Sequence, residues 1–197
     1  MGNLEWKEVA TRHILQNKWI DVRESAFRFP DGRVVKPFYS YSRRDYVVVV
    51  ARDTGGNFVC VRQFRQGIRE VTTEFVAGGI ERRDGKQYGK RGQDAEDALL
   101  AAKRELLEET GHESDDWTHL LTIPSNATIA DNYAYVYFAD NCRRVSAPNL
   151  DETEFLEVVK HTPAELEELI RAGQFQQSVH VMAYFLAKEM LVPRTAL

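Results

Sequence analysis

Runs of apolar residues bounded by turn residues fill the first part of this chain and predict a β-rich fold. Residues 4–44 alternate in strand fashion around a turn at Pro30–Arg33, with strand-like runs at Trp19–Arg23 and Val34–Tyr41. Tyr46–Ala51 is apolar almost throughout, as in a strand that is buried on both faces. Further strands are expected at Phe58–Gln63, Glu70–Val76, Trp117–Ile123, Ala134–Phe138 and Phe155–Lys160.

Helical patterns are confined to the middle and the end of the chain. An alanine- and leucine-rich run starts at about Ala95, with Asp94 as its expected N-cap, and stops at Gly111. Two further helices are expected at Pro163–Ala172 and Ser178–Leu191, the second of them amphipathic. The sequence therefore predicts one helix between strands and two helices that close the chain.

The order of these elements indicates an α+β fold. Strands, one helix, further strands on either side of a polar loop at residues 141–153, and two closing helices predict a mixed sheet packed between helices. We divide the chain into an N-terminal antiparallel β annex at 1–44 and one domain at 45–197. A chain of 197 residues can bury a core that needs no disulfide or metal for stability.

Three carboxylates lie at the unfavourable end of the middle helix, on Glu105, Glu108 and Glu109. The helix dipole disfavours anions there, and Glu105 and Glu109 form a like-charge pair on adjacent turns. Both lie at the edge of an apolar stripe that includes Leu106. Carboxylates gathered at a core boundary repel one another unless a cation lies among them, and hard oxygen ligands favour Mg²⁺ or Mn²⁺. The alternative is a solvated acidic helix face.

Composition and charge narrow the classes of function. Apolar residues make up 43% and charged residues 28% of the chain, as in an ordinary globular protein. The net charge of −4 argues against nucleic acid as a partner, because such binding needs a basic surface. Without a membrane-length apolar run or a signal-peptide core, we expect a cytoplasmic protein with no membrane partner. Cys60 and Cys142 are expected to be reduced.

The acidic helix end also carries a recognisable motif. Glu96, seven further residues and the run from Arg104 to Gly111 (RELLEETG) resemble the second half of the Nudix box, G-x5-E-x7-R-E-U-x-E-E-x-G-U, in which U is aliphatic. Every specified position from Glu96 to Gly111 matches. Two positions depart from the pattern, because His112 replaces the final aliphatic residue and Lys90 stands at the position of the leading glycine.

The resemblance extends to the ADP-ribose and ADP-sugar pyrophosphatase branch of this family. Residues 74–81 (EFVAGGIE) are similar to its E-x-P-A-G-x-I-E strand and turn, with valine in place of proline. The resemblance implies an αβα sandwich with a mixed sheet and a bound Mg²⁺, with Mn²⁺ as a substitute. The implied metal ligands are Glu105, Glu108, Glu109 and the backbone carbonyl of Ala77.

The same resemblance gives supporting roles to four other residues. Gly78 lets the backbone approach the metal and the substrate without a Cβ clash. Arg104 pairs with a carboxylate of the helix and holds its orientation. Glu96 fixes the preceding loop, and Gly111 ends the helix.

The resemblance implies roles in substrate binding and catalysis for two further segments. The segment Val61–Arg65 (VRQFR) is similar to a strand that binds substrate, in which Arg65 contacts the diphosphate or the terminal ribose and Arg62 accompanies it. After the box, Glu154 matches an acid that orients or activates the attacking water, with Glu152 and Glu157 as alternatives. Solvated side chains without a role are the alternative in both segments.

The annex is expected to recognise the base. Asn17–Ile20 (NKWI) is similar to a segment of dimeric ADP-sugar pyrophosphatases in which the tryptophan, here Trp19, stacks on adenine. A second aromatic from the other subunit would be Phe38 or Tyr39. The resemblance thus implies a homodimer formed through the N-terminal strands. Plain core or dimer packing is the alternative for Trp19.

The resemblance implies Mg²⁺-dependent hydrolysis of the pyrophosphate bond of ADP-ribose or a related ADP-sugar, which gives AMP and a sugar phosphate. The sugar-side glycine signature is missing from Ile123–Tyr133, so the sugar and the base stay open. One alternative is hydrolysis of (d)NTPs or other nucleoside diphosphate derivatives, and another is a ligand-sensing module without catalysis. The basic insertion Arg82–Gly92 is either a clamp over phosphates or a solvated loop.

Overall fold

The computed structural model of the protein describes residues 3–82 and 95–191. The chain forms two compact units, and each of them is built from several segments. The first unit comprises Met1–Asp45, Glu81–Ala95 and Pro124–Tyr133, and the second comprises Tyr46–Ile80, Glu96–Ile123 and Ala134–Leu197. The expected division at residue 44 stays a prediction. Apart from Arg82, the basic insertion lies outside the described residues, as does Asp94.

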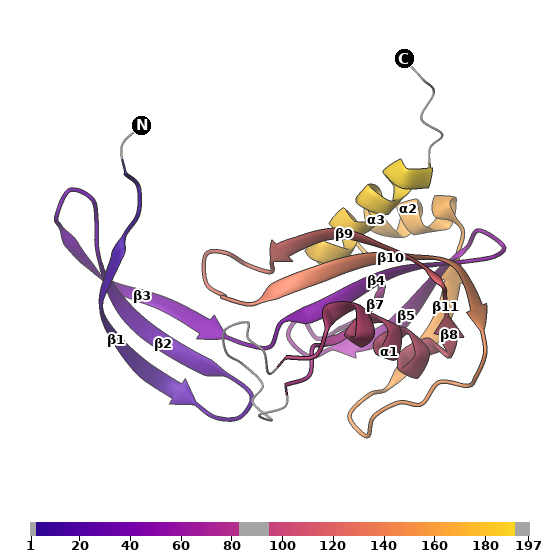
Figure 1. Cartoon of the computed structure of the whole chain (residues 1–197), viewed down its shortest axis with the longest axis horizontal. Helices are drawn as coiled ribbons and strands as arrows, with labels where there is room; N and C mark the ends of the chain where they lie inside the picture. Colours follow the sequence, from indigo (N-terminus) through magenta and orange to yellow (C-terminus); the bar gives the residue numbers. More distant parts are fainter. Residues whose placement is uncertain (1–2, 83–94, 192–197) are drawn as a thin grey trace, which may run out of the picture. The chain divides into compact units, whose positions relative to one another are not determined.

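The first unit contains an antiparallel sheet in the order β1-β2-β3, coloured indigo to purple in Figure 1. Its strands are β1 (Lys7–Gln16), β2 (Asp21–Arg28) and β3 (Val34–Ser42). The sequence predicted the regions of β2 and β3, but it gave no defined strand at β1. Every residue of β1 is exposed, so no alternation of buried and exposed positions marks this edge strand.

The second unit contains a mixed sheet in the order β11-β5-β4-β10-β8, with β6 paired to β5, β7 to β4 and β9 to β10. β10 is parallel to β4, whereas β5, β7, β8 and β11 form antiparallel pairs. The strands are β4 (Tyr46–Asp53), β5 (Phe58–Arg65), β6 (Glu70–Glu74), β7 (Val76–Gly79), β8 (His112–Glu113), β9 (Asp116–Pro124), β10 (Tyr133–Arg144) and β11 (Leu156–His161).

Helices cover both faces of this sheet, as Figure 1 shows. On one face α1 (Ala98–Thr110) packs against β4 and β7, and on the other α3 (Ser178–Leu191) packs against β4 and α2 (Pro163–Arg171) against β11. The core between the sheet and α2 and α3 includes Phe58, Phe75, Leu166 and Tyr184. The predicted α+β class and αβα sandwich are confirmed. Within residues 3–82 and 95–191, no helix is long and apolar enough to cross a membrane.

The helix α1 begins three residues later than predicted. Its N-cap is Asp97, whose carboxylate accepts hydrogen bonds from the backbone N–H groups of Leu99 and Leu100. Ala95, the expected start, instead forms a β-bridge with Arg82. At the other end, Gly111 adopts a left-handed φ of 69° and its N–H donates to the Leu107 carbonyl, which is the predicted stop.

The prediction of a polar loop at 141–153 was wrong for its first residues, because β10 continues to Arg144. Asn141 has a positive φ of 55°, and the register between β10 and β4 shifts between Ala139 and Cys142. The strand resumes after this bulge and pairs with β8. The exposed residues of this extension are polar, so the sequence pattern there resembles a loop and not a strand. Cys142 and Cys60 are buried free thiols, as predicted.

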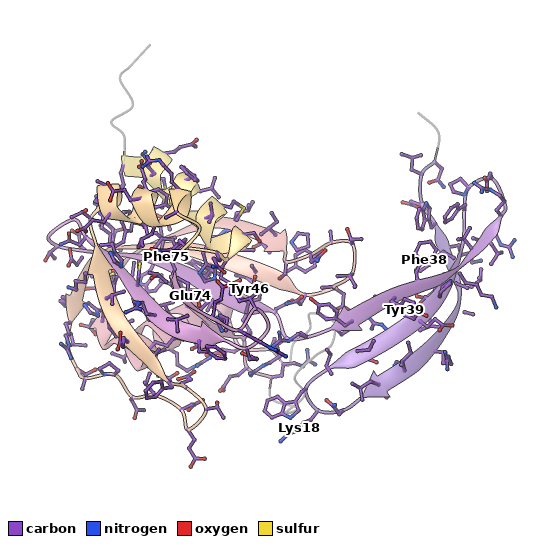
Figure 2. All side chains as sticks on the ribbon, turned by 180° about the vertical axis from the view of Figure 1, so that it is seen from behind. Lys18, Phe38, Tyr39, Tyr46, Glu74 and Phe75 are labelled. Atoms are coloured by element: carbon purple, nitrogen blue, oxygen red, sulfur yellow. The ribbon has the colours of Figure 1, made fainter. Side chains whose placement is uncertain are left out.

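A buried histidine lies in the core beside α3. His180 is 3% exposed and its ring stacks on that of Phe75, which Figure 2 labels. Its Nδ1 accepts a hydrogen bond from the backbone N–H of Phe75 at 3.1 Å, which requires that nitrogen to be unprotonated. Burial lowers the pKa of His180 to about 4.

This histidine makes stability depend on pH. An unfolded chain binds a proton at His180 near pH 6.5, whereas the folded chain binds it only near pH 4. The free energy of unfolding should therefore fall as pH drops through this window, by on the order of 3 kcal/mol. His180→Asn keeps an acceptor and cannot titrate, so urea unfolding of this variant should show a shallower fall.

The matched control is His119→Asn, because His119 is exposed. It should keep the full pH dependence of the wild-type protein. Equal slopes in the wild-type protein and His180→Asn would show that His180 is not the group responsible.

Candidate metal and catalytic site

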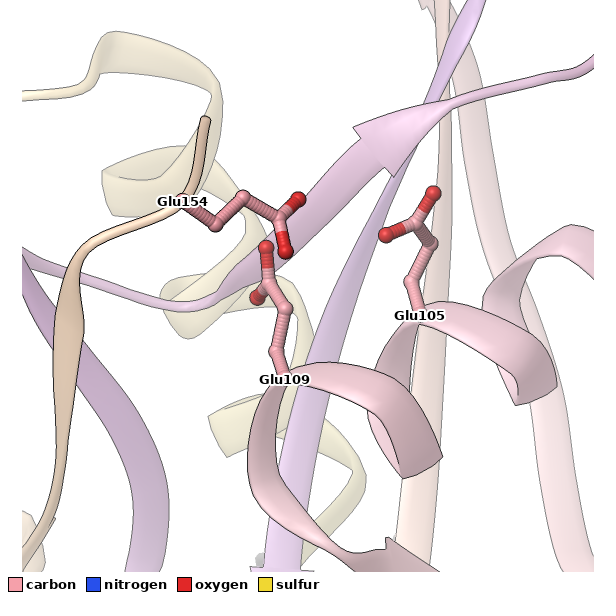
Figure 3. A group of neighbouring side chains, drawn as sticks. All are labelled: Glu105, Glu109 and Glu154. Carbon is pink, nitrogen blue, oxygen red and sulfur yellow. The ribbon is translucent and has the colours of Figure 1, made fainter. Parts of the chain in front are cut away.

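Three carboxylates converge beside α1, as Figure 3 shows. Glu105 and Glu109 lie on adjacent turns of α1, and Glu154 comes from the segment before β11. One oxygen from each of the three lies within 4.8 Å of the other two. Glu105 is 6% and Glu109 is 3% exposed, whereas Glu154 is half-buried. We call these three residues the carboxylate cluster.

In the part of the chain that the structure describes, nearby arginines offset only part of the effect of burial on the carboxylate cluster. Burial raises the pKa of Glu105 to about 7, and the neighbouring Arg104 offsets this only in part. Burial also raises the pKa of Glu109 well above its usual value, as do Glu105 and Glu154, against smaller opposite effects of Arg65 and the backbone of Ala77. Among the described residues, the buried Oε2 of Glu109 has no hydrogen-bond partner. An orphaned buried oxygen within an all-carboxylate donor set fits a hard divalent cation.

Gly78 forms the wall opposite Glu105. It lies in β7, paired with Val47 of β4. A Cβ atom built on Gly78 would lie 1.9 Å from Cδ of Glu105, so any side chain would take the place of this carboxylate. The glycine is therefore required by close approach to Glu105. The part expected of the Ala77 carbonyl as a metal ligand stays a prediction.

Arg104 donates hydrogen bonds to three carboxylates in and next to the carboxylate cluster. Its Nη1 donates to Glu105 and to Glu108, both at 2.9 Å, and its Nη2 donates to Glu96 at 3.1 Å and to the Gly79 carbonyl at 3.3 Å. These contacts are the ones that a positioning role requires. Glu108 is not part of the carboxylate cluster, and its expected role as a metal ligand stays a prediction.

The two arginines expected to bind substrate have protein partners. Arg65 makes two hydrogen bonds to the fully buried Glu74, at 2.8 and 2.6 Å. Glu74, labelled in Figure 2, is thus neutralised by Arg65, a pairing that the sequence analysis missed. Arg62 pairs at 3.3 Å with the exposed Glu157, one of the alternative catalytic acids. Arg65 retains a third of its side-chain surface.

The aromatic residues expected to bind the base lie in the first unit. Trp19 is 58% exposed, and Nζ of Lys18 lies 4.6 Å from its ring. Phe38 packs against Trp6, Phe27 and Phe29, with centroid separations of 5.3, 5.6 and 6.3 Å. Figure 2 labels Phe38 and the exposed Tyr39 on β3. Trp19 is thus more than half exposed, whereas part of Phe38 is covered by its neighbours.

This chain is similar to known proteins over most of its length. The NUDIX domain family matches residues 42–183 of the chain. An ADP-ribose pyrophosphatase of Bacillus subtilis (strain 168) is 26% identical over 194 residues, covering 97% of this chain and 98% of its own length. A methanol dehydrogenase activator of Bacillus methanolicus is 26% identical over 185 residues, covering 93% of each chain.

A solved structure supports the same fold. The crystal structure of an ADP compounds hydrolase superposes with a TM-score of 0.80 at 20% identity and covers 97% of each chain. The family match extends over more than half of the chain and includes α1 with its carboxylates. The protein is a member of the Nudix hydrolase family.

Proposed function

We propose that the protein hydrolyses the pyrophosphate bond of ADP-ribose or a related ADP-sugar, with Mg²⁺ as cofactor and Mn²⁺ as a substitute. The products are AMP and a sugar phosphate. The observation that carries this proposal is the carboxylate cluster, with its orphaned Glu109 oxygen and Gly78 beside Glu105. The near full-length similarity to the ADP-ribose pyrophosphatase of B. subtilis supports this choice of substrate.

The chemistry needs charge neutralisation and positioning more than covalent work by the protein. Glu105, Glu109 and Glu154 would hold the metal, with Glu108 and the Ala77 carbonyl as further ligands. A bound divalent ion neutralises the diphosphate and polarises its P–O bonds. Water attacks one phosphorus, and the bond from that phosphorus to the bridging oxygen breaks.

Glu154 is the proposed acceptor for the proton of the attacking water. It comes from outside α1 and is less buried than Glu105 and Glu109. Its carboxylate faces that of Glu109 (Figure 3), and this proximity supports a role as the base beside the proposed metal ligands. Glu152 is the alternative, because Glu157 is paired with Arg62.

Substrate recognition is assigned to residues outside the carboxylate cluster. Arg65 and Arg62 bind the phosphates or the terminal sugar, and Gly78 admits the substrate close to the backbone. Trp19 stacks on the base, with Phe38 as the second aromatic. An exposed β1 and the half-exposed Trp6 support a homodimer through the N-terminal strands. We retain a cytoplasmic location and the absence of nucleic acid and membrane partners as predictions.

A substrate screen tests this function. With Mg²⁺, ADP-ribose or another ADP-sugar should yield AMP and a sugar phosphate by chromatography, with kcat/KM at least about tenfold above that for dATP. EDTA should abolish turnover, and added Mg²⁺ should restore it. The screen includes GDP-mannose and NADH.

Preference for dATP would favour the triphosphate alternative. Absence of turnover on every compound would favour the ligand-sensing module.

A further inference from the structure

His112 occupies the position at which the Nudix box has an aliphatic residue, yet it is only 2% exposed. It forms β8 with Glu113, directly after the Gly111 cap of α1. In the antiparallel pair of β8 and β10, His112 lies opposite Arg144, and Glu113 lies opposite Arg143. Since opposite residues share a face of a sheet, His112 and Arg144 face one side, and Arg143 faces the other.

The hydrogen bonds of His112 define its tautomer. Nδ1 lies 3.0 Å from the carbonyl oxygen of Thr110 and 3.1 Å from its hydroxyl. That hydroxyl donates its proton to the Leu106 carbonyl, so both oxygens of Thr110 act as acceptors and Nδ1 must carry the proton. In the neutral ring, Nε2 is therefore an acceptor. It is buried and has no partner within residues 3–82 and 95–191.

A pocket with a volume of about 380 Å³ lies beside this imidazole. Its walls are Thr110, His112, Arg144, Pro148, Val158 and Lys160. All six belong to the second unit, and none is part of the carboxylate cluster. The volume is at the small end of the range of ligand sites, which is about 300–1,000 Å³, and it suits a compact molecule.

The polar wall of the pocket presents two cations. Nε of Arg144 donates to the Ser146 carbonyl at 3.1 Å, and its two terminal nitrogens have no hydrogen-bond partner among the described residues. Lys160 makes a 2.8 Å ion pair with Asp53, which balances its positive charge. Arg144 has no such acidic partner among the described residues. Val158 and Pro148 add an apolar surface.

We propose that this pocket is a second ligand site, which binds a compact phosphate monoester that carries a hydroxyl group. The phosphate oxygens accept hydrogen bonds from Arg144 and Lys160. The ligand hydroxyl donates to Nε2 of His112 and satisfies a buried acceptor, and the carbon chain contacts Val158 and Pro148.

Glycerol 3-phosphate is the probe, titrated calorimetrically into the wild-type protein in EDTA at about pH 8, where phosphate monoesters are dianions. We expect saturable binding. Arg144→Ser and His112→Leu should each weaken it at least about tenfold, whereas Arg143→Ser should bind as the wild-type protein does. Sulfate has no hydroxyl to donate to Nε2 and should bind at least about tenfold more weakly.

Thermal unfolding checks that each variant is folded, and the exposed Arg144 makes its variant the safer test. The proposal is overturned by absence of binding to the wild-type protein, by unchanged binding in Arg144→Ser or His112→Leu, by equal loss in Arg143→Ser, or by equal affinity for sulfate. Because the titration uses neither metal nor nucleotide, its result is independent of the proposed hydrolysis.

Discussion

Replacing Glu109 with glutamine is expected to lower kcat at least about a hundredfold, because a ligand of the catalytic ion is lost. Glutamine has the same size, so the packing of α1 is kept. The variant also removes a buried carboxylate that is repelled by Glu105 and Glu154. The melting temperature in EDTA should therefore stay the same or rise while activity falls.

Glu168→Gln is the matched control, since Glu168 is an exposed residue of α2. Its kcat should equal that of the wild-type protein. Steady-state kinetics with saturating Mg²⁺ measures both variants. If Glu109→Gln keeps more than about a tenth of kcat, Glu109 is not a ligand of the catalytic ion.

Gly78→Ala is the second substitution with a large expected effect. The new methyl group would occupy the place of the Glu105 carboxylate, 1.9 Å from its Cδ. Because that carboxylate is the end of a flexible side chain, it can rotate away and the fold should survive. The metal site should not survive this displacement, and kcat/KM should fall at least about tenfold.

Gly67→Ala is the control for this change. A Cβ atom added to Gly67 would have no neighbour within 4 Å, and this glycine has no positive φ. The substitution should leave kcat/KM unchanged, as measured at several Mg²⁺ concentrations. Wild-type activity of Gly78→Ala would show that the position of Glu105 beside Gly78 is not needed for catalysis.

The fold was predictable where burial leaves a pattern in the sequence. The apolar run at β4 and the amphipathic α3 were predicted at or near their observed bounds. Prediction failed at β1, where every residue is exposed, and at the extension of β10 beyond Asn141, where the outward-facing residues are polar. In both places the strand is specified by its partner strand, which local sequence does not reveal.

The candidate site was predictable to the extent that it lies on one helix. The spacing of Glu105 and Glu109 predicted that their side chains lie next to each other on α1. The Nudix resemblance, which the family match confirms, indicated a metal site there. The pairing of Arg65 with buried Glu74 depends on contacts between strands. The resemblance already favoured Glu154 over Glu152 and Glu157, but its position near Glu105 and Glu109 depends on the path of the chain before β11.

The central claim is that the carboxylate cluster binds a divalent cation. Titration with Mn²⁺, followed by the electron paramagnetic resonance signal of the free ion, tests it most directly. The wild-type protein should bind Mn²⁺, and Glu109→Gln and Glu105→Gln should each weaken binding at least about tenfold, with Glu168→Gln unchanged. Equal Mn²⁺ binding by the wild-type protein and both cluster variants would contradict the claim.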